Sequence, residues 1–262
     1  MHREDASTMV TRKSPYEIAI MRESGRLVAQ AHALVRAAIA PGVATIELDA
    51  LVHAFASKAG GELVFKGYKG FPGHICASIN EEIVHGVPGP RRLAAGDIIA
   101  VDIGIRYKGY VGDAAWTYPV GEVDAASRAL LDAGEEALRR GIAAAQPGAR
   151  VSAIGRAVQS FAESKGYGVV RDYTGHGVGE SMHEAPQIPN FVEEPRVGSQ
   201  DPKLKPGLVI AIEPMLNAGT HLTATYKIKG WEVVITRDRK RSVHFEHTVA
   251  ITEAGPVILT LP

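Results

Sequence analysis

An approximate internal repeat is the feature of this sequence that most restricts its fold. At an offset of 106 residues, Pro41-Gly42 recurs as Pro147-Gly148 and Gly60 recurs as Gly166. Apolar residues between these markers recur as well, in the pairs Leu48/Ile154, Val52/Val158 and Phe55-Ala56/Phe161-Ala162. Such self-similarity is typical of a structural unit that occurs twice. We therefore predict two halves of similar fold; a chance similarity between two amphipathic segments is the alternative.

The repeat continues, at an offset of 111 residues, into segments rich in β-branched residues. "LAAGDIIAVD", which begins at Leu93, aligns with "LKPGLVIAIE", which begins at Leu204, so Asp102 corresponds to Glu213. Helical periodicity precedes these segments in both halves, and Pro and Gly end the helices. We predict an α+β fold with pseudo-two-fold symmetry, in which one curved antiparallel sheet carries helices on its outside.

Two aspartates lie on one predicted β-hairpin. In "VDIGIRYKGYVGDAAW", Lys108-Gly109 is typical of a tight hairpin turn. The residue numbers of two paired positions then sum to 217, so Asp113 pairs with Gly104. Asp113 and Asp102 therefore lie on the same face, with their Cβ atoms about 7–8 Å apart. A solvent-facing polar face would explain this pair in isolation. On an apolar strand pair, a bound cation would explain it, because like charges repel when desolvated.

Two further acids stand inside apolar, β-branched runs. They are Glu213 in "VIAIEPM" and Glu246 in "HFEHTVAI". An ionised carboxylate is buried only with a partner, and an arginine would suffice for Glu213 alone. Four acids, two from each half, carry more negative charge than one ammonium or guanidinium group offsets. We therefore predict that one or two divalent metal ions balance them.

The segment "TGHGVGESMHEAP", from 174 to 186, contains two histidines among glycines. It lacks the following helix of a phosphate-binding loop, Ser181 lacks the close flanking glycines of a nucleophile elbow, and the glycines disfavour a His-Glu-x-x-His helix. Glycines beside His176 let the chain approach a metal, and imidazole is a suitable ligand beside carboxylates. His183 reaches the same centre only if the segment bends; two histidines in an ordinary polar loop are the alternative.

Composition excludes several classes of partner. Lysine plus arginine and aspartate plus glutamate both number 29, so no net charge favours nucleic acid or an anionic membrane, and we expect no DNA partner. Neither a signal peptide nor an apolar stretch of about 18 residues is present, so we expect no membrane partner. The single cysteine, Cys76, excludes an internal disulfide and fits a reducing compartment. We expect a cytoplasmic protein, with a monomer as the default.

Five acid and imidazole residues, in this order, resemble the metal signature of the pita-bread metallopeptidases: Asp102, Asp113, His176, Glu213 and Glu246. The similarity is greatest to the bacterial type I methionine aminopeptidases and extends from about Pro15 to the C-terminus. The segments that carry it are "SINEEIVHGVP", "DIGIRYKGYVGDAAWTYPVG", "GHGVGESMHEAPQIPN", "LKPGLVIAIEPML" and "FEHTVAIT". Several dispersed motifs in a fixed order are far more specific than any one of them.

The resemblance implies the pita-bread fold of creatinases and aminopeptidases, with the curved pseudo-two-fold sheet. It implies a single catalytic domain at 15–262, with halves at about 15–124 and 125–262, after a polar tail at 1–14. It also implies a hydrolase that removes the N-terminal methionine from nascent proteins and peptides, with a preference for a small second residue. Nascent chains would be its macromolecular substrate in protein maturation.

The resemblance further implies two divalent metal ions. Asp102 and Asp113 would bind one ion, His176 and Glu213 would bind the other, and Asp113 and Glu246 would bridge them or be shared. Metal-held water would be the nucleophile, its pKa lowered by the ions, with Glu213 as the proton shuttle. One imidazole among carboxylates favours Mn, Fe or Co, with Zn and Ni as alternatives.

Substrate contacts are implied by the same resemblance. His183 would donate a hydrogen bond to the scissile carbonyl or its oxyanion, and His85 would contact the peptide backbone near the leaving nitrogen. The positions that match the wall of the methionine pocket are Tyr68, Phe71, Cys76, Met182 and Trp231. Met182 stands where the family commonly has Phe, and Phe71 where it commonly has Tyr, which leaves the pocket's shape and its tolerance for other side chains open.

Two other functions use related motifs. Prolidases and Xaa-Pro aminopeptidases of this fold usually carry a large N-terminal domain, whereas about 14 residues precede the core here. Non-catalytic binding proteins of this fold tend to lose metal ligands, and this sequence has all five.

The remaining polar features are expected to be structural. We expect surface or packing positions for His53, His74, His221, His244 and His247. The basic runs at 227–229 and 237–241 are expected to be solvated strand ends and turns, with a ribosome contact as the alternative.

Overall fold

The computed structural model describes residues 10–192 and 201–262, so positions 1–9 of the predicted polar tail lie outside the described residues. The helices are α1 (Pro15–Ala38), α2 (Thr45–Ala59), the 3-10 helix η1 (Tyr68–Gly70), α3 (Ala125–Ala144) and α4 (Val151–Ser164). The strands are β1 (Glu62–Leu63), β2 (Cys76–Ile79), β3 (Glu82–Val84), β4 (Ile98–Tyr107), β5 (Tyr110–Pro119), β6 (Gly168–Val169), β7 (Gly175–Gly177), β8 (Glu184–Ile188), β9 (Val209–Ile212), β10 (Met215–Asn217), β11 (Thr223–Ile228), β12 (Trp231–Thr236), β13 (Ser242–His244), β14 (His247–Thr252) and β15 (Gly255–Ile258).

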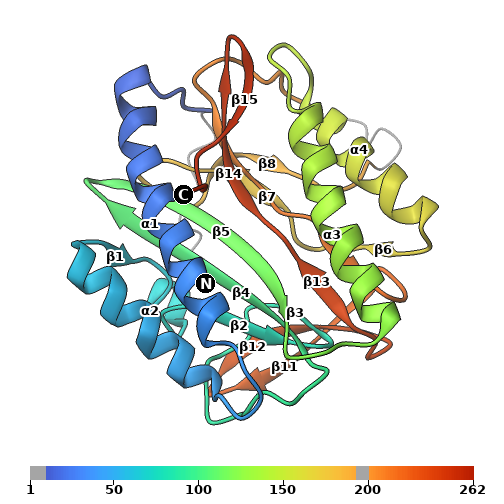
Figure 1. Ribbon diagram of the computed structural model, residues 1–262. Coiled ribbons are helices and arrows are strands. Elements are labelled where there is room, and N and C mark those ends of the chain that lie inside the picture. The colour runs from blue at the N-terminus through green and yellow to red at the C-terminus, as the bar shows by residue number, and fades with distance from the viewer. Residues whose placement is uncertain (1–9, 193–200) are drawn as a thin grey trace.

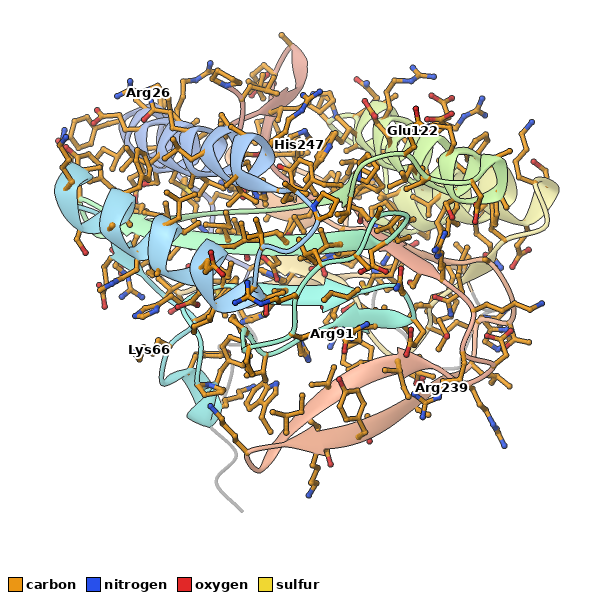
Figure 2. All side chains as sticks on the ribbon, turned by 60° about the horizontal axis from the view of Figure 1, so that its bottom comes forward. Arg26, Lys66, Arg91, Glu122, Arg239 and His247 are labelled. Atoms are coloured by element: carbon orange, nitrogen blue, oxygen red, sulfur yellow. The ribbon has the colours of Figure 1, made fainter. Side chains whose placement is uncertain are left out.

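The four long helices lie outside the strands, as predicted. In Figure 1, α1 and α2 cover strands of the first half, and α3 and α4 cover strands of the second half. Figure 2 shows Arg26 and Glu122 on the helical side of the strands, with Lys66, Arg91 and Arg239 on the opposite side. The strand pairs are antiparallel, which confirms the predicted α+β class.

Among the described residues, the curved antiparallel arrangement is divided into four hydrogen-bonded sheets that are not joined by one continuous ladder. Their strand orders are β1-β4-β2 with β5 paired to β4, β13-β10-β6, β11-β12-β3, and β15-β14-β9-β7-β8. The two largest sheets meet where β5 passes β14. There the Thr248 hydroxyl donates to the Asp113 carbonyl oxygen at 2.7 Å and accepts from the Asp113 amide at 3.0 Å. The Glu246 amide donates to the Ala115 carbonyl oxygen at 2.8 Å, so a few specific bonds replace a ladder at this seam.

The sequence repeat is reproduced in the hydrogen bonds. The Gly42 amide donates to the Leu93 carbonyl oxygen and the Gly148 amide donates to the Leu204 carbonyl oxygen, each at 2.7 Å. These glycines have φ values of 91° and 86°, a conformation that side-chain-bearing residues rarely adopt. The repeated apolar residues of α2 and α4 are buried in both halves: Leu48, Val52, Ala56, Ile154, Val158 and Ala162. The two halves therefore share the same glycine turn and the same buried helix face, as the repeat predicts.

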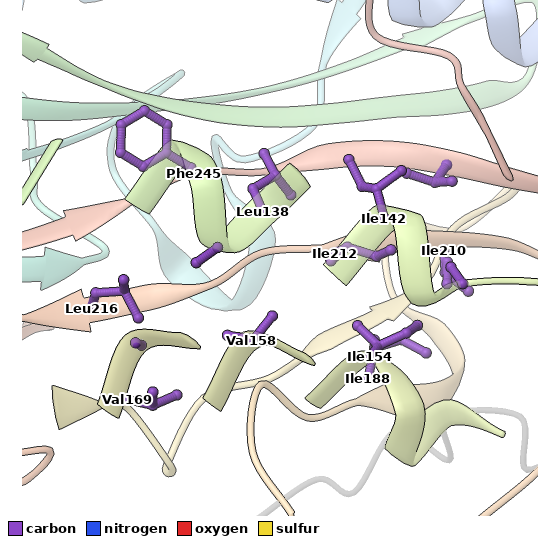
Figure 3. Close-up of a cluster of buried hydrophobic side chains, with 14 of the residues drawn as sticks. Leu138, Ile142, Ile154, Val158, Val169, Ile188, Ile210, Ile212, Leu216 and Phe245 are labelled. Atoms are coloured by element: carbon purple, nitrogen blue, oxygen red, sulfur yellow. The ribbon is translucent and has the colours of Figure 1, made fainter. Parts of the chain in front are cut away.

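Each half packs its helices on its own apolar core. In the second half, shown in Figure 3, Leu138 of α3, Val158 of α4 and Ile212 of β9 belong to one buried apolar cluster. In the first half, Val28 of α1 and Leu48 of α2 belong to the cluster that covers β4. Burial of such a side chain contributes roughly 1.5–3 kcal/mol. The cores hold the strands, and therefore the acids on them, in fixed positions.

Helix α1 begins at a capping box. The Ser14 hydroxyl accepts from the Glu17 amide at 3.3 Å, and the Glu17 carboxylate accepts from the Ser14 amide at 2.7 Å, which is a capping box. Pro15 occupies the first turn, where no amide hydrogen is needed.

Within residues 10–192 and 201–262, no helix is both long enough and apolar enough to cross a bilayer.

A buried histidine on α1 makes stability depend on pH. The ring of His32 hydrogen-bonds the Tyr118 hydroxyl through Nδ1 and the Ala114 carbonyl oxygen through Nε2, both at 2.9 Å. Burial lowers the pKa of His32 from 6.5 to about 4, although the bond to Ala114 opposes this. Below pH 6.5 the unfolded chain therefore binds a proton that the folded chain does not. The stability contribution is complete above pH 6.5 and is lost as the pH falls toward 4.

We predict that His32→Gln reduces the loss of unfolding free energy between pH 7 and pH 4 by about 3 kcal/mol, because this proton-binding difference disappears. Urea titrations at pH 7, 5.5 and 4 measure the loss. His53→Gln, on the exposed face of α2, is the control and should keep the parent's pH dependence. The same loss in His32→Gln as in the parent would contradict the prediction.

Candidate metal centre and active site

A cavity of ≈ 230 Å³ is lined by residues of both halves. It is lined by all twelve residues that the sequence analysis expects as metal ligands, catalytic residues or pocket wall: Tyr68, Phe71, Cys76, His85, Asp102, Asp113, His176, Met182, His183, Glu213, Trp231 and Glu246. Six others complete the wall: Phe65, Lys69, Val84, Tyr173, Thr174 and His244. The structure thus brings together segments that are more than 150 residues apart in the sequence.

The β4–β5 hairpin places the two aspartates as predicted. Asp113 pairs with Gly104, and the turn residues Lys108 and Gly109 have φ values of 50° and 89°. Positive φ at both central positions is the property of a two-residue turn that matches strand twist. Because side chains alternate along a strand, Asp102 and Asp113 face the same cavity.

The second half supplies its acids from strand ends. Glu213 directly follows β9 and Glu246 directly precedes β14, and these strands pair with His247 opposite Ile212. The antiparallel pairing therefore brings the two glutamates to the same end of the ladder. The Asn190 side-chain amide donates to the Glu213 carbonyl oxygen at 3.0 Å and fixes the backbone there.

His176 presents one ring nitrogen to these acids. Its Nδ1 bonds the Gly177 carbonyl oxygen at 2.9 Å. Its Nε2 lies 3.5 Å from a Glu213 oxygen and 3.8 Å from an Asp113 oxygen. A neutral imidazole that donates from Nδ1 offers the Nε2 lone pair, which is the form that binds metals.

Glycines beside His176 are required by close backbone packing. A Cβ at Gly175 would lie 2.3 Å from the Ala211 carbonyl oxygen, and one at Gly177 would lie 2.4 Å from the Ala185 carbonyl oxygen. Strand β7 can therefore fit between β8 and β9 only with glycine at both positions. This supports the sequence interpretation that the glycines let the chain approach the centre.

The acids repel one another. Burial, together with repulsion from Asp113 and Glu213, raises the pKa of Asp102 well above its usual range. Burial also raises the pKa of Asp113 to about 6, with the His176 ring opposing the shift. The pKa of Glu246 is likewise raised well above its usual range, by burial and by its acidic neighbours. The carboxylates carry full charge together only if a cation joins them.

The residues fit a metal ion. Ligand atoms of Asp113, His176 and Glu246 lie within 4.8 Å of one another. One oxygen each of Asp102, Asp113 and Glu246 is buried without a hydrogen-bond partner in the part of the chain that the structure describes. Oxygen atoms in this state are expected of ligands, because a cation supplies the missing partner.

Two more histidines face the same cavity. The ring centroids of His183 and His176 are 4.1 Å apart, so the segment bends as the sequence interpretation required. Burial, with a smaller effect of the His176 ring, lowers the pKa of His183 to about 3, and burial lowers the pKa of His85 to about 4. His85 has a φ of 65°, in the left-handed region that side-chain-bearing residues seldom adopt. Both rings are neutral near pH 7.

His244 was wrongly expected at the surface or in ordinary packing. Its side chain is buried, lines the cavity and places Nε2 3.4 Å from a Glu213 oxygen. It stands two residues before Glu246, and the two-residue period of a strand is the signal that would have found it. His53 and His74 do pack together, with ring centroids 4.2 Å apart, and His247 bonds Thr260, as expected of packing residues.

Comparisons with known proteins agree with this geometry. Residues 19–253 match the family model described as metallopeptidase family M24. The chain belongs to this family. Methionine aminopeptidase 1 of Bacillus subtilis is 50% identical over 252 residues, which cover 96% of this chain and 99% of that protein. The pita-bread fold and membership of a metallopeptidase family are thereby shown for this chain.

Two kinds of solved structure resemble this chain to different extents. The crystal structure of methionine aminopeptidase from Rickettsia prowazekii superposes with a TM-score of 0.92 at 38% identity, covering 97% of this chain and all of that one. Prolidase from Pyrococcus furiosus superposes with a TM-score of 0.76 at 26% identity, covering 96% of this chain but 65% of that one. The M24 chain described here is therefore similar to the first over the whole length of both chains.

We predict that Mn(II) raises the Tm of the metal-free M24 protein, because the ion removes repulsion among the acids. At 100 times the dissociation constant the stabilisation would be about 2.7 kcal/mol. The shift should be larger at pH 7.5 than at pH 5.5, where Asp113 holds a proton that the metal must displace. Differential scanning calorimetry measures it.

Glu246→Gln should reduce this Mn(II) shift, and the exposed Glu253→Gln should preserve it. Equal shifts in both variants, or none in the parent, would contradict assignment of the metal to this cavity.

Proposed function

We propose that this M24 metallopeptidase hydrolyses the first peptide bond of chains that begin with methionine and prefers a small second residue. The observation that carries the proposal is the convergence, in one cavity, of five metal-ligand side chains, two neutral histidines and an apolar wall. The full-length similarity to methionine aminopeptidases supports it. The prolidase alternative has less support, because that chain is matched over a smaller share.

Five side chains would hold two divalent ions: Asp102, Asp113, His176, Glu213 and Glu246. When bound, the ions would lower the pKa of a water molecule and polarise the scissile carbonyl group. Four carboxylates and one imidazole suit Mn, Fe or Co, and Zn and Ni are the alternatives.

Glu213 is the proton carrier in this proposal. It accepts a proton from the attacking water and donates it to the leaving amide nitrogen, so the C–N bond breaks and free methionine and a new peptide amine result. The carboxylate lies between two imidazoles, 3.5 Å from His176 and 3.4 Å from His244. These contacts limit its rotation.

His183 would stabilise the oxyanion. Its Nδ1 lies 3.0 Å from the Tyr68 hydroxyl oxygen. A neutral imidazole that accepts the Tyr68 hydrogen at Nδ1 carries its own proton on Nε2, and this N–H can donate to the substrate. His85, neutral and held in its left-handed backbone conformation, would contact the peptide backbone near the leaving nitrogen.

An apolar wall would receive the methionine side chain. Phe71 and Trp231 meet edge to face with centroids 5.1 Å apart, and Cys76 and Met182 are buried beside them. Burial, together with Asp102 and Asp113, raises the pKa of the Cys76 thiol well above its usual value, so this wall is uncharged. An uncharged, partly sulfur-containing wall suits a thioether.

The substrates would be peptides and nascent chains that begin with methionine, and such substrates would be met in the cytoplasm. We propose a monomer. The basic runs at 227–229, at the end of β11, and at 237–241, between β12 and β13, would be the contact if the protein docks on a ribosome; solvated strand ends and turns are the alternative.

We predict that the Mn(II)- or Co(II)-loaded protein releases methionine from Met-Ala-Ser and leaves Ala-Pro-Ser intact. Glu213→Gln should lower kcat by about 10²–10⁴-fold through loss of the proton carrier. Methionine release is followed by liquid chromatography, with metal content checked by elemental analysis. Cleavage of the Xaa-Pro peptide in place of Met-Ala-Ser would favour the prolidase alternative.

We also predict that His183→Ala lowers kcat by about 10²–10³-fold while KM changes little, since the hydrogen bond acts on the oxyanion. Steady-state kinetics with Met-Ala-Ser measure both constants. His53→Ala, outside the cavity, is the matched control. A large rise in KM at unchanged kcat would instead assign His183 to ground-state binding.

A further inference from the structure

The segment that precedes α1 contacts the loop that carries His183. The Lys13 side chain is 5% exposed, and its Nζ lies 2.5 Å from a Glu184 oxygen and 2.6 Å from the Thr11 hydroxyl. The Thr11 hydroxyl also donates to Glu184 at 2.6 Å, and the Lys13 amide donates to the Gly207 carbonyl oxygen at 2.6 Å. Residues 11–13 of the predicted polar tail are therefore built into the fold.

Glu184 is the covalent neighbour of His183. Successive side chains of an extended segment point to opposite sides, and here His183 lines the cavity while Glu184 meets Lys13. The second Glu184 oxygen accepts from the Ser181 amide at 3.4 Å, inside the same loop. One carboxylate thus ties the loop to itself and to the N-terminal segment.

Close packing leaves this loop little freedom. A Cβ at Gly179 would lie 2.1 Å from a Glu184 oxygen and 2.7 Å from the Lys13 side chain. The Val111 amide donates to the Gly179 carbonyl oxygen at 2.8 Å, which anchors the start of the loop to β5. Lys13 anchors its other end, next to His183.

Burial makes this ion pair different from those on the surface. The side chains of Lys13 and Glu184 are 5% and 15% exposed, whereas those of Lys108 and Glu23 are 53% and 42% exposed. When one partner of a buried pair is removed, the remaining charge has no compensation and the loop must rearrange. When one partner of an exposed pair is removed, water solvates the remaining charge.

We propose that Lys13 is a positioning residue for His183. Through Glu184 it fixes the backbone from which the His183 ring projects toward the substrate carbonyl. The inference rests on the proposed role of His183 in peptide hydrolysis. It extends the functional unit to a residue in front of the first helix, so displacement of this segment reduces turnover without touching the metal ligands.

The first test separates turnover from binding. Lys13→Met should lower kcat at least about 10-fold, because misplacement of a catalytic group by about 1 Å costs up to about 100-fold, while KM and metal content stay near the parent's. Glu184→Gln should act in the same direction, and Lys13→Arg should recover part of the activity. Glu23→Gln removes the exposed ion pair and should match the parent.

A double-mutant cycle tests the route through His183. In a His183→Ala background, Lys13→Met should cause little further loss, because the group that it positions is absent. Hydrogen–deuterium exchange of the peptide 178–188 should be faster in Lys13→Met than in the parent and unchanged in Glu23→Gln. If Lys13→Met does not fold, Glu184→Gln takes its place in the cycle.

The outcomes are distinct. The same fold loss in both backgrounds, or parent-like kinetics for Lys13→Met and Glu184→Gln, would overturn the positioning role. Failure of the metal-loaded parent to cleave Met-Ala-Ser would overturn the proposed function instead. In that event, parent-like exchange at 178–188 in Lys13→Met would overturn the anchoring of the loop as well.

Discussion

The repulsion among four carboxylates that line one cavity is the constraint on which the rest of this structure depends. Asp102 and Asp113 come from one half of the chain, and Glu213 and Glu246 come from the other. Burial and mutual repulsion raise the pKa values of Asp102, Asp113 and Glu246. The ionised carboxylates therefore repel one another in the folded chain. The apolar cores of the two halves supply the free energy that keeps them together, and a bound cation would remove the conflict.

The junction between the two halves, where β5 meets β14, lies beside these carboxylates. Specific bonds, from Thr248 to Asp113 and from Glu246 to Ala115, join β5 to β14 where a regular ladder is absent. Side chains at such a junction can face a common cavity. In a continuous ladder, the neighbouring strands would occupy the space in which that cavity lies. The same junction admits His176 from a strand whose glycines leave no room for other side chains.

Much of the site could be predicted from sequence where the geometry is local. The Lys108-Gly109 turn fixes the hairpin register, and the register fixes which face Asp102 and Asp113 share. The repeat predicted equivalent turns at Gly42 and Gly148 because both need a positive φ. His244 was missed although its two-residue spacing from Glu246 was a local signal, and its contact with Glu213 depends on how two distant strands end. Lys13 was missed because a lysine in a polar segment has no local feature that predicts burial.

The sequence by itself determined the halves, the hairpin, the capped first helix and the chemical types of the candidate ligands, because periodicity, turn residues and capping act over a few residues. Tertiary structure alone decided that the strands divide into four sheets, that His244 faces Glu213 and that Lys13 anchors the His183 loop. The contacts of His244 and Lys13 join residues 31 and 171 positions apart. Their geometry is set by the packing of whole elements on the two cores, which no short segment encodes.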